Sequence, residues 1–188
     1  MKRAYENIDL LDEHLLVEKC IEDNRLYQEA FYKKFAPKMF AVCKNYADSR
    51  DEAMDFLQDG FVSVFNNLHK YRFEGSLEGW VKRVIVYRTI EALRRKKRYN
   101  EVLSKVDNIE SVEPVDYEIE NISTPVEKIK NLVNGLPEKA GLILKLYAIE
   151  GYTHAEISEI LGVSIGTSKS QLNRARKLIK EGLVSNNG

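Results

Sequence analysis

Near its C-terminus the chain reads Thr153-His-Ala-Glu-Ile-Ser-Glu-Ile-Leu161, then Gly162-Val163-Ser164, and then a helical pattern from Ile165 to Leu178. Thr153 can cap the first helix, while Glu156 reaches back to the backbone N–H of the cap. Gly162 tolerates a positive φ, and Ser164 can cap the second helix. Two capped helices separated by so short a turn predict a helix-turn-helix, a motif that reads DNA.

The second of these helices is basic on its outer side, with no acidic residue before Glu181. We expect its exposed positions to be Thr167, Ser168, Lys169, Ser170, Asn173, Arg174, Arg176, Lys177 and Lys180. The inward positions are then Ile165, Leu172, Ala175, Leu178 and Ile179. Such a helix can approach a phosphate backbone and present short polar groups to base edges. A plain amphipathic hairpin with a solvated charged side is the alternative.

The formal net charge is zero over 188 residues, but the charges are segregated. Between Lys70 and Arg98 there are ten basic residues against three acidic ones. From Glu101 to Glu127 the sign inverts, with eight acidic residues against Lys105. The first stretch suits a nucleic-acid partner, and the second is typical of a linker.

Helical periodicity without alternating β-branched runs predicts an all-α protein of two small helical domains. We expect a first domain over residues 9–98, a flexible acidic linker over 99–125, and a second domain over 126–184. Thr124-Pro125 is a good start for the first helix after the linker.

One helix of the first domain has an apolar stripe and an acidic face. The stripe consists of Met54, Leu57, Phe61, Val64 and Leu68. The opposite face carries Asp51, Asp55, Gln58 and Asp59. This face can meet a basic partner, or it can simply be solvated.

Aromatic and basic residues alternate from Tyr71 into a helix expected over Leu77–Arg98. Exposed bases stack on aromatic rings while cations hold phosphates, so this pattern predicts a single-stranded nucleic-acid site. The loop at Gly75-Ser76 can admit an unstacked base. Each aromatic residue, Trp80 included, also fits a place in the core.

The sequence gives little support for a metal-binding protein, a membrane or secreted protein, or an enzyme. Cys20 and Cys43 lack the spacing of a zinc site, and no apolar run suits a membrane span or a signal peptide, so a cytoplasmic protein without cofactors is expected. The histidines His14, His69 and His154 fall at unrelated places, and His154 is expected at the surface. Without a phosphate-binding glycine loop or a nucleophile beside a base, an enzyme is not expected.

Three motifs of the first domain resemble region 2 of bacterial sigma factors: Asp55-Phe-Leu-Gln58-Asp59-Gly-Phe61, Phe73-Glu-Gly75-Ser76 with Trp80-Val-Lys-Arg83, and Arg94-Arg95-Lys96-Lys97-Arg98. The C-terminal block resembles region 4 through Leu136-Pro137, Gly151-Tyr152-Thr153, Leu161-Gly162-Val163-Ser164 and Gly166-Thr167-Ser168-Lys169-Ser170. The order and separation of the two regions are those of the compact extracytoplasmic-function (ECF) class of the sigma-70 family.

The resemblance implies a transcription initiation factor that binds RNA polymerase core and promoter DNA. Asp55, Gln58 and Asp59 would bind the β′ clamp, and the second domain would meet the β flap. The start-proximal promoter element would be bound and held open by Tyr71, Phe73, Gly75, Ser76, Trp80, Arg83, Tyr87, Arg88, Arg94, Arg95, Lys96, Lys97 and Arg98. The upstream element would be bound by Thr167, Ser168, Lys169, Ser170, Asn173, Arg174, Arg176 and Lys177. An anti-sigma factor is a further expected partner.

This chain departs from the family pattern at three positions. Tyr87 stands where Asn is common, Asp59 replaces a more usual Glu, and Ser168 stands where Val is frequent. Tyr87 can stack on a base in place of the polar contact of an Asn. A stand-alone helix-turn-helix regulator that binds DNA as a dimer is the alternative function, although it would need neither the acidic face nor the aromatic and basic segment.

Overall fold

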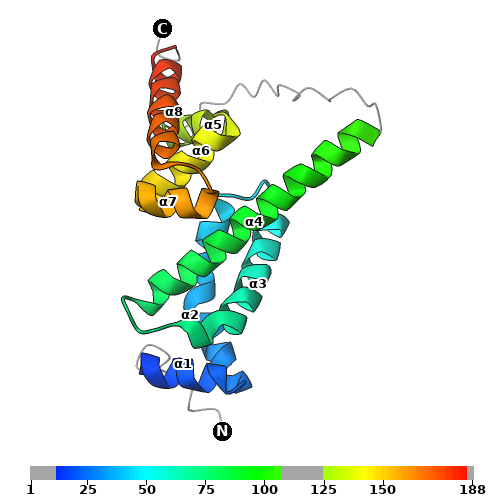
Figure 1. Cartoon of the computed structure of the whole chain (residues 1–188), viewed down its shortest axis with the longest axis vertical. Coiled ribbons are helices and arrows are strands. Elements are labelled where there is room, and N and C mark those ends of the chain that lie inside the picture. Colours follow the sequence, from blue (N-terminus) through cyan, green and yellow to red (C-terminus); the bar gives the residue numbers. More distant parts are fainter. Residues whose placement is uncertain (1–11, 107–124, 186–188) are drawn as a thin grey trace. The chain divides into compact units, whose positions relative to one another are not determined.

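The computed structural model of the chain describes residues 12–106 and 125–185, and every regular element within those ranges is a helix (Figure 1). The chain forms two compact units, Met1–Lys105 and Val106–Gly188. The predicted all-α class is confirmed. Most of the predicted linker lies outside the described residues.

The first unit contains four α-helices and a short 3-10 turn in its described part. They are α1 (Glu13–Ile21), α2 (Arg25–Lys44), α3 (Arg50–Asn67), η2 (Leu68–Lys70) and α4 (Leu77–Val106). Side chains cap the first three helices: Asp12 accepts from the backbone N–H of His14, Asn24 from Leu26, and Ser49 from Glu52. Each cap satisfies a backbone donor that has no partner within its helix.

The core of the first unit lies between α2, α3 and α4, with α1 packed on α2 and η2. The stripe predicted on α3 is confirmed, because Leu57, Phe61, Val64 and Leu68 are buried and Met54 is half-buried. Gly60 lets α4 approach α3 closely, since a Cβ atom at this position would lie 2.9 Å from Cγ1 of Ile85.

The helix α4 crosses α2 and α3 and continues through Val106, beyond the end expected at Arg98 (Figure 1). Its first half is anchored by buried Val81, Ile85 and Ile90. From Arg94 to Glu101 every side chain is exposed. The basic run therefore lies on a helical extension of the packed part of α4.

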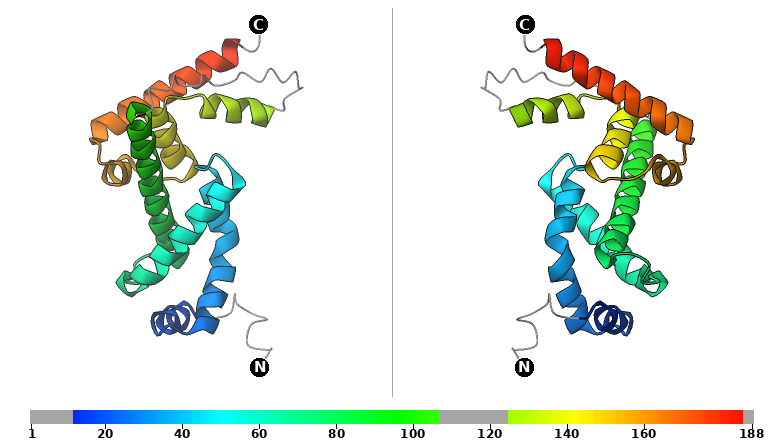
Figure 2. Two further views of the ribbon diagram at one scale, coloured as in Figure 1. Left: turned by 90° about the vertical axis from the view of Figure 1, so that its right-hand side faces the viewer. Right: turned by 90° about the vertical axis from the view of Figure 1, so that its left-hand side faces the viewer.

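The second unit contains α5 (Pro125–Asn134), α6 (Glu138–Leu144), a π-helical turn η3 (Lys145–Ile149), α7 (His154–Leu161) and α8 (Ile165–Ser185). The helix α5 begins at Pro125, as predicted. Figure 2 shows α5 alongside the C-terminal part of α8. The core forms where α6, η3 and α7 meet α8, and its centre consists of Ile143, Leu146, Ile157, Leu172 and Ala175.

Candidate nucleic-acid interface

The predicted helix-turn-helix is formed by α7 and α8. The capping box is present: the backbone N–H of Thr153 donates to Glu156 at 2.9 Å, and the N–H of Glu156 donates to Oγ1 of Thr153 at 3.3 Å. Gly162 ends α7 with φ +63°, in the left-handed region that favours glycine. Ser164 then accepts from the backbone N–H of Thr167 at 3.0 Å. These contacts fix the angle at which α8 leaves α7.

The outer face of α8 is polar and basic. Its exposed side chains are Lys169, Ser170, Asn173, Arg174, Arg176, Lys177 and Lys180. Thr167 is half-buried. Lys177 lies 3.8 Å from Glu181 on the next turn, and both side chains are exposed. This face has the composition expected of a surface that meets phosphates and base edges.

Two expectations for α8 are wrong. Ser168 is fully buried, because it shares a helix face with Leu172 and Ala175, which lie four and seven positions further along. Ile165, expected to face inward, is 46% exposed, because it opens the helix between the exposed residues Ser164 and Gly166. Ser168 therefore supports the packing of α8 and does not reach its outer surface.

A group of side chains on the second unit connects this packing to the outer face. Nδ1 of His154 lies 2.9 Å from Oγ of Ser168. The His154 ring stacks on Tyr147 with centroids 4.7 Å apart, and the guanidinium of Arg176 lies 5.6 Å from the centre of the Tyr147 ring. The expectation of His154 as a plain surface residue is wrong, because it is half-buried between these partners. Tyr147, on the π-helical turn, was missed because its role depends on a contact made far along the chain.

The loop before α4 is ordered by its own aromatic residues. Tyr71 is only 7% exposed, and its hydroxyl donates to the carbonyl of Gly75 at 2.9 Å. The rings of Tyr71 and Trp80 lie 5.6 Å apart. Ser76 caps α4 by accepting from the backbone N–H of Gly79 at 3.1 Å. Tyr71 is therefore a core residue, which was the alternative to an exposed base-binding position, and Trp80 is half-buried at the edge of the core.

Other predicted residues of this segment are exposed. Phe73 is 40% exposed and Tyr87 is 47% exposed, so both rings can be reached by a nucleobase. Arg83 is also exposed, whereas Arg88 is half-buried and lies 2.8 Å from Glu91.

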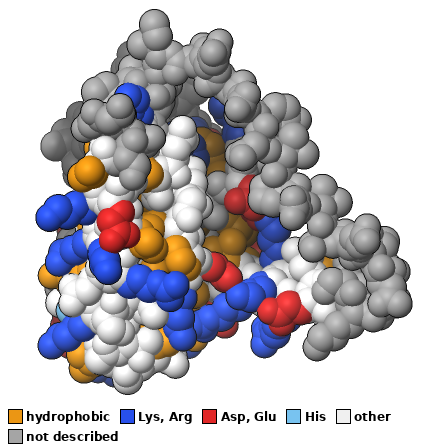
Figure 3. All heavy atoms as spheres, turned by 90° about the horizontal axis from the view of Figure 1, so that it is seen from above, with side chains coloured by type: hydrophobic (Ala, Val, Ile, Leu, Met, Phe, Trp, Pro, Cys, Tyr) orange, Lys and Arg blue, Asp and Glu red, His pale blue; other side chains and the backbone are white. Residues whose placement is uncertain are grey.

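Figure 3 shows Lys and Arg side chains spread more widely than Asp and Glu over the face that it draws, despite the net charge of zero.

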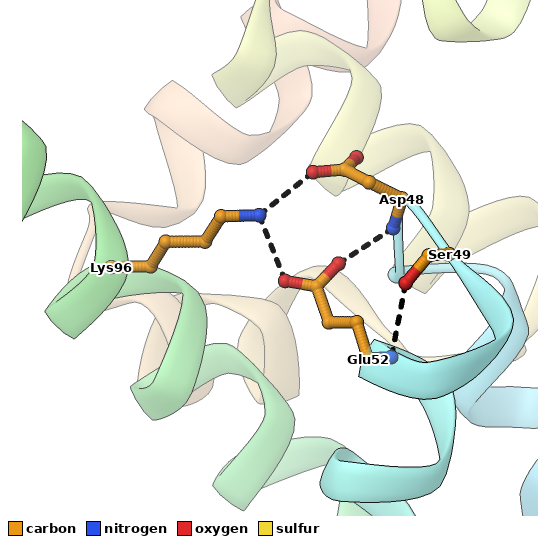
Figure 4. Close-up of polar contacts among 4 residues, drawn as sticks. All are labelled: Asp48, Ser49, Glu52 and Lys96. Atoms are coloured by element: carbon orange, nitrogen blue, oxygen red, sulfur yellow. Dashed lines mark hydrogen bonds and ion pairs between the residues drawn. The ribbon is translucent and has the colours of Figure 1, made fainter.

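Within the basic run, Lys96 is engaged by the first unit itself (Figure 4). Its Nζ atom lies 2.8 Å from both Oδ2 of Asp48 and Oε1 of Glu52, at the start of α3. Its hydrogen bonds raise the pKa of Lys96, the one to Asp48 contributing most and the one to Glu52 next. Glu52 also accepts from the backbone N–H of Asp48 at 2.7 Å. Lys96 therefore ties the exposed extension, which also carries Arg94, Arg95, Lys97 and Arg98, back to the start of α3.

The acidic face of α3 is exposed as expected. Asp51, Asp55, Gln58 and Asp59 all lie on the side opposite buried Leu57 and Phe61. What binds this face stays a prediction at this point.

The described residues offer no group of three or more His, Cys, Asp and Glu side chains that could hold a metal ion. Cys20 and Cys43 are both buried, and burial raises the pKa of Cys20 to about 12. Of the helices that the structure describes, none combines the length and the hydropathy needed to cross a bilayer.

Comparison with known proteins matches both units. Residues 31–99 match the family described as Sigma-70 region 2, and residues 127–179 match Sigma-70, region 4. ECF RNA polymerase sigma factor SigE of Mycolicibacterium smegmatis is 25% identical over 154 residues, which cover 81% of this chain and 60% of that protein. The ECF RNA polymerase sigma-E factor of Haemophilus influenzae is 24% identical over 180 residues, covering 90% of this chain and 94% of the relative.

Two solved structures share the fold. One is the sigma factor RpoE of Bartonella quintana in complex with the anti-sigma factor NepR, with a TM-score of 0.58, 20% identity, and coverage of 82% of this chain and 95% of that one. The other is CnrH in complex with the cytosolic domain of CnrY, with a TM-score of 0.54, 15% identity, and coverage of 92% and 97%. Both regions occur in the order of the family, on helical units that expose the expected surfaces. The chain therefore belongs to the sigma-70 family of transcription initiation factors and, within it, to the extracytoplasmic-function class.

Proposed function

We propose that this protein binds RNA polymerase core, directs it to promoters with two sequence elements, and helps to hold the start-proximal element open. The outer face of α8 is the main support for this proposal. It carries seven exposed polar and basic side chains, and the capped turn before α8 fixes the angle between α7 and α8. In this assignment α8 meets the upstream element in the major groove. No covalent chemistry is involved.

The first unit supplies the other half of the function. The face with Asp55, Gln58 and Asp59 binds the β′ clamp, and the second unit meets the β flap. The segment from Phe73 to Arg98 binds the unpaired strand near the start site. Exposed Phe73 and Tyr87 offer stacking surfaces, and the exposed basic run on α4 can hold the phosphates.

Tethering explains why a chain of zero net charge can act on DNA. Two weak DNA-binding units attached to one polymerase gain from effective concentration, so neither unit needs high affinity alone. We therefore expect weak binding of the isolated protein to duplex promoters. An anti-sigma factor is a further proposed partner, since the Bartonella relative is held in complex with one.

Capture of genomic DNA tests this function. The tagged chain is incubated with fragmented DNA of the source organism, with and without core polymerase, and the retained fragments are sequenced. Fragments that share two separated elements should be retained only when core is present. Capture of palindromic sites without core would instead support the dimeric regulator.

A further inference from the structure

The side chain of His14 stacks on Phe73 and so ends a series of aromatic contacts whose other members come from the loop before α4 and from α4 itself. The rings of His14 and Phe73 are nearly parallel, with centroids 3.9 Å apart and an interplanar angle of 9°. Phe73 lies 4.8 Å from Tyr71, which lies 5.6 Å from Trp80. These ring contacts thus lead from buried Tyr71 to the stacked pair of Phe73 and His14 at the surface of α1.

The outer end of this stack is held open to solvent. Phe73 has φ +59°, a left-handed conformation that is costly for a bulky residue and that the surroundings must impose. The ring nevertheless stays 40% exposed, and His14 is exposed as well. The backbone N–H of His14 donates to Asp12 at 3.3 Å, which fixes His14 in the first turn of α1. The fold therefore presents two stacked rings at its surface.

The surroundings suit a nucleobase better than a phosphate. Burial, with the nearby carboxylate of Glu13, raises the pKa of the Tyr71 hydroxyl. Glu13 is exposed and precedes His14 in the first turn of α1. A carboxylate repels phosphate but can accept a hydrogen bond from an exocyclic amine of a base. Gly75 borders open space, because nothing would lie within 4 Å of a Cβ atom there. Arg72, between the two loop aromatics in sequence, is exposed and can meet the backbone of the same strand.

We propose that His14 is a base-stacking residue, and that an unpaired base of the start-proximal element packs on the ring face of His14 that points away from Phe73. This inference rests on the proposed function and extends the binding surface to α1, outside the residues 31–99 matched to region 2. A base stacked on His14 meets a ring that is already held against Phe73, so little conformational freedom is lost on binding.

Binding of single-stranded DNA to the full chain with core polymerase tests this role. The probe is an AT-rich oligonucleotide with aminopurine, a fluorescent adenine analogue, placed at successive positions in separate samples. Wild-type protein should quench the analogue at one position. His14→Ala should remove that quenching and weaken binding by about 5-fold to 100-fold, the value of one stacked base. His14→Trp should restore both signals.

His69→Ala is the matched control, because His69 is an exposed histidine on η2 of the same unit. It should bind as the wild type does, and thermal unfolding of all variants should show that each is folded. Equal binding by His14→Ala and wild type would overturn the proposed role of His14 but not the proposed function. Tighter binding by His14→Ala would do the same, because it would mean that the base takes the place of His14 on Phe73. No binding by wild type in the presence of core would overturn both this inference and the proposed function.

Discussion

Nδ1 of His154 and Oγ of Ser168 lie 2.9 Å apart and join α7 to α8. Ser168 has no exposed surface, so its hydroxyl cannot turn to water for a partner. The two helices of the DNA-binding motif are therefore held by a polar contact as well as by the apolar contacts of Ile157 and Leu172. This contact can be removed without touching the outer face of α8.

Ser168→Ala should destabilise the second unit by about 1 kcal/mol, because half-buried His154 loses its hydroxyl partner. Hydrogen exchange of the α8 amides measures this change locally. Ser170→Ala is the control, since Ser170 is exposed on the same helix. Equal protection in both variants would mean that the contact contributes nothing to stability.

Tyr147→Leu should weaken binding of the polymerase complex to an upstream element about 2-fold to 5-fold, because Arg176 loses the ring that orients it. The affinity should be measured over a series of salt concentrations, together with Arg176→Ala and the double variant. If Tyr147 acts through Arg176, the double variant should lose no more affinity than Arg176→Ala. Additive losses would show that the two residues act separately. Tyr99→Leu, at an exposed tyrosine of α4, controls for loss of a surface ring.

Lys96→Met should lower the stability of the first unit at neutral pH by about 1 kcal/mol or less, since the Lys96 side chain is 46% exposed and its ion pairs are screened by water. The pKa of Lys96 is raised in the fold above the reference value of 10.5. Its contribution is therefore complete below pH 10.5 and is lost as the pH rises through the folded pKa. Urea unfolding of wild type and Lys96→Met at several pH values should show that the difference between their free energies of unfolding becomes smaller in the alkaline range. Arg95→Met is the control and should cause a smaller loss of stability at neutral pH. If the difference in stability between wild type and Lys96→Met persists above the folded pKa of Lys96, the ion pairs are not its source.

Asp59→Arg should weaken binding of core polymerase at least tenfold while leaving the first unit folded, because it places a cation on an exposed acidic face that is proposed to meet a basic partner. Calorimetry or fluorescence titration with core measures the loss. Glu18→Arg replaces an acid by arginine in the same way, at an exposed position of α1 in the same unit, and should bind core normally. Unchanged binding by Asp59→Arg would show that this face of α3 is only solvated.

Local signals in the sequence were sufficient for the caps and for the main helix faces. The capping box depends on a fixed spacing of Thr153 and Glu156, and the α3 stripe depends on helical periodicity, so neither needs tertiary information. Ser168 was predictable in principle, because Leu172 and Ala175 share its face. Residue type alone groups Ser168 with its polar neighbours, and its helical position outweighs its residue type.

Contacts between distant segments could not be predicted from the sequence. Nothing in the residues around His14 indicates that it will stack on Phe73, since this depends on how α1 packs against η2. The ion pairs of Lys96 with Asp48 and Glu52 likewise require α3 and α4 to cross at a particular point. A run of five cations looks uniform in the sequence, whereas the fold places Lys96 between two carboxylates at the start of α3.

Mapping of transcript starts tests the central claim most directly. Core RNA polymerase of the source organism is supplied with fragmented genomic DNA, with wild-type chain, with Asp59→Arg, with Arg174→Ala or with no addition, and the RNA 5′ ends are sequenced. Discrete new starts that share two upstream elements should appear with wild type, disappear with Asp59→Arg, and fall with Arg174→Ala although this variant still binds core. The same starts with and without the wild-type chain would contradict its assignment as an initiation factor.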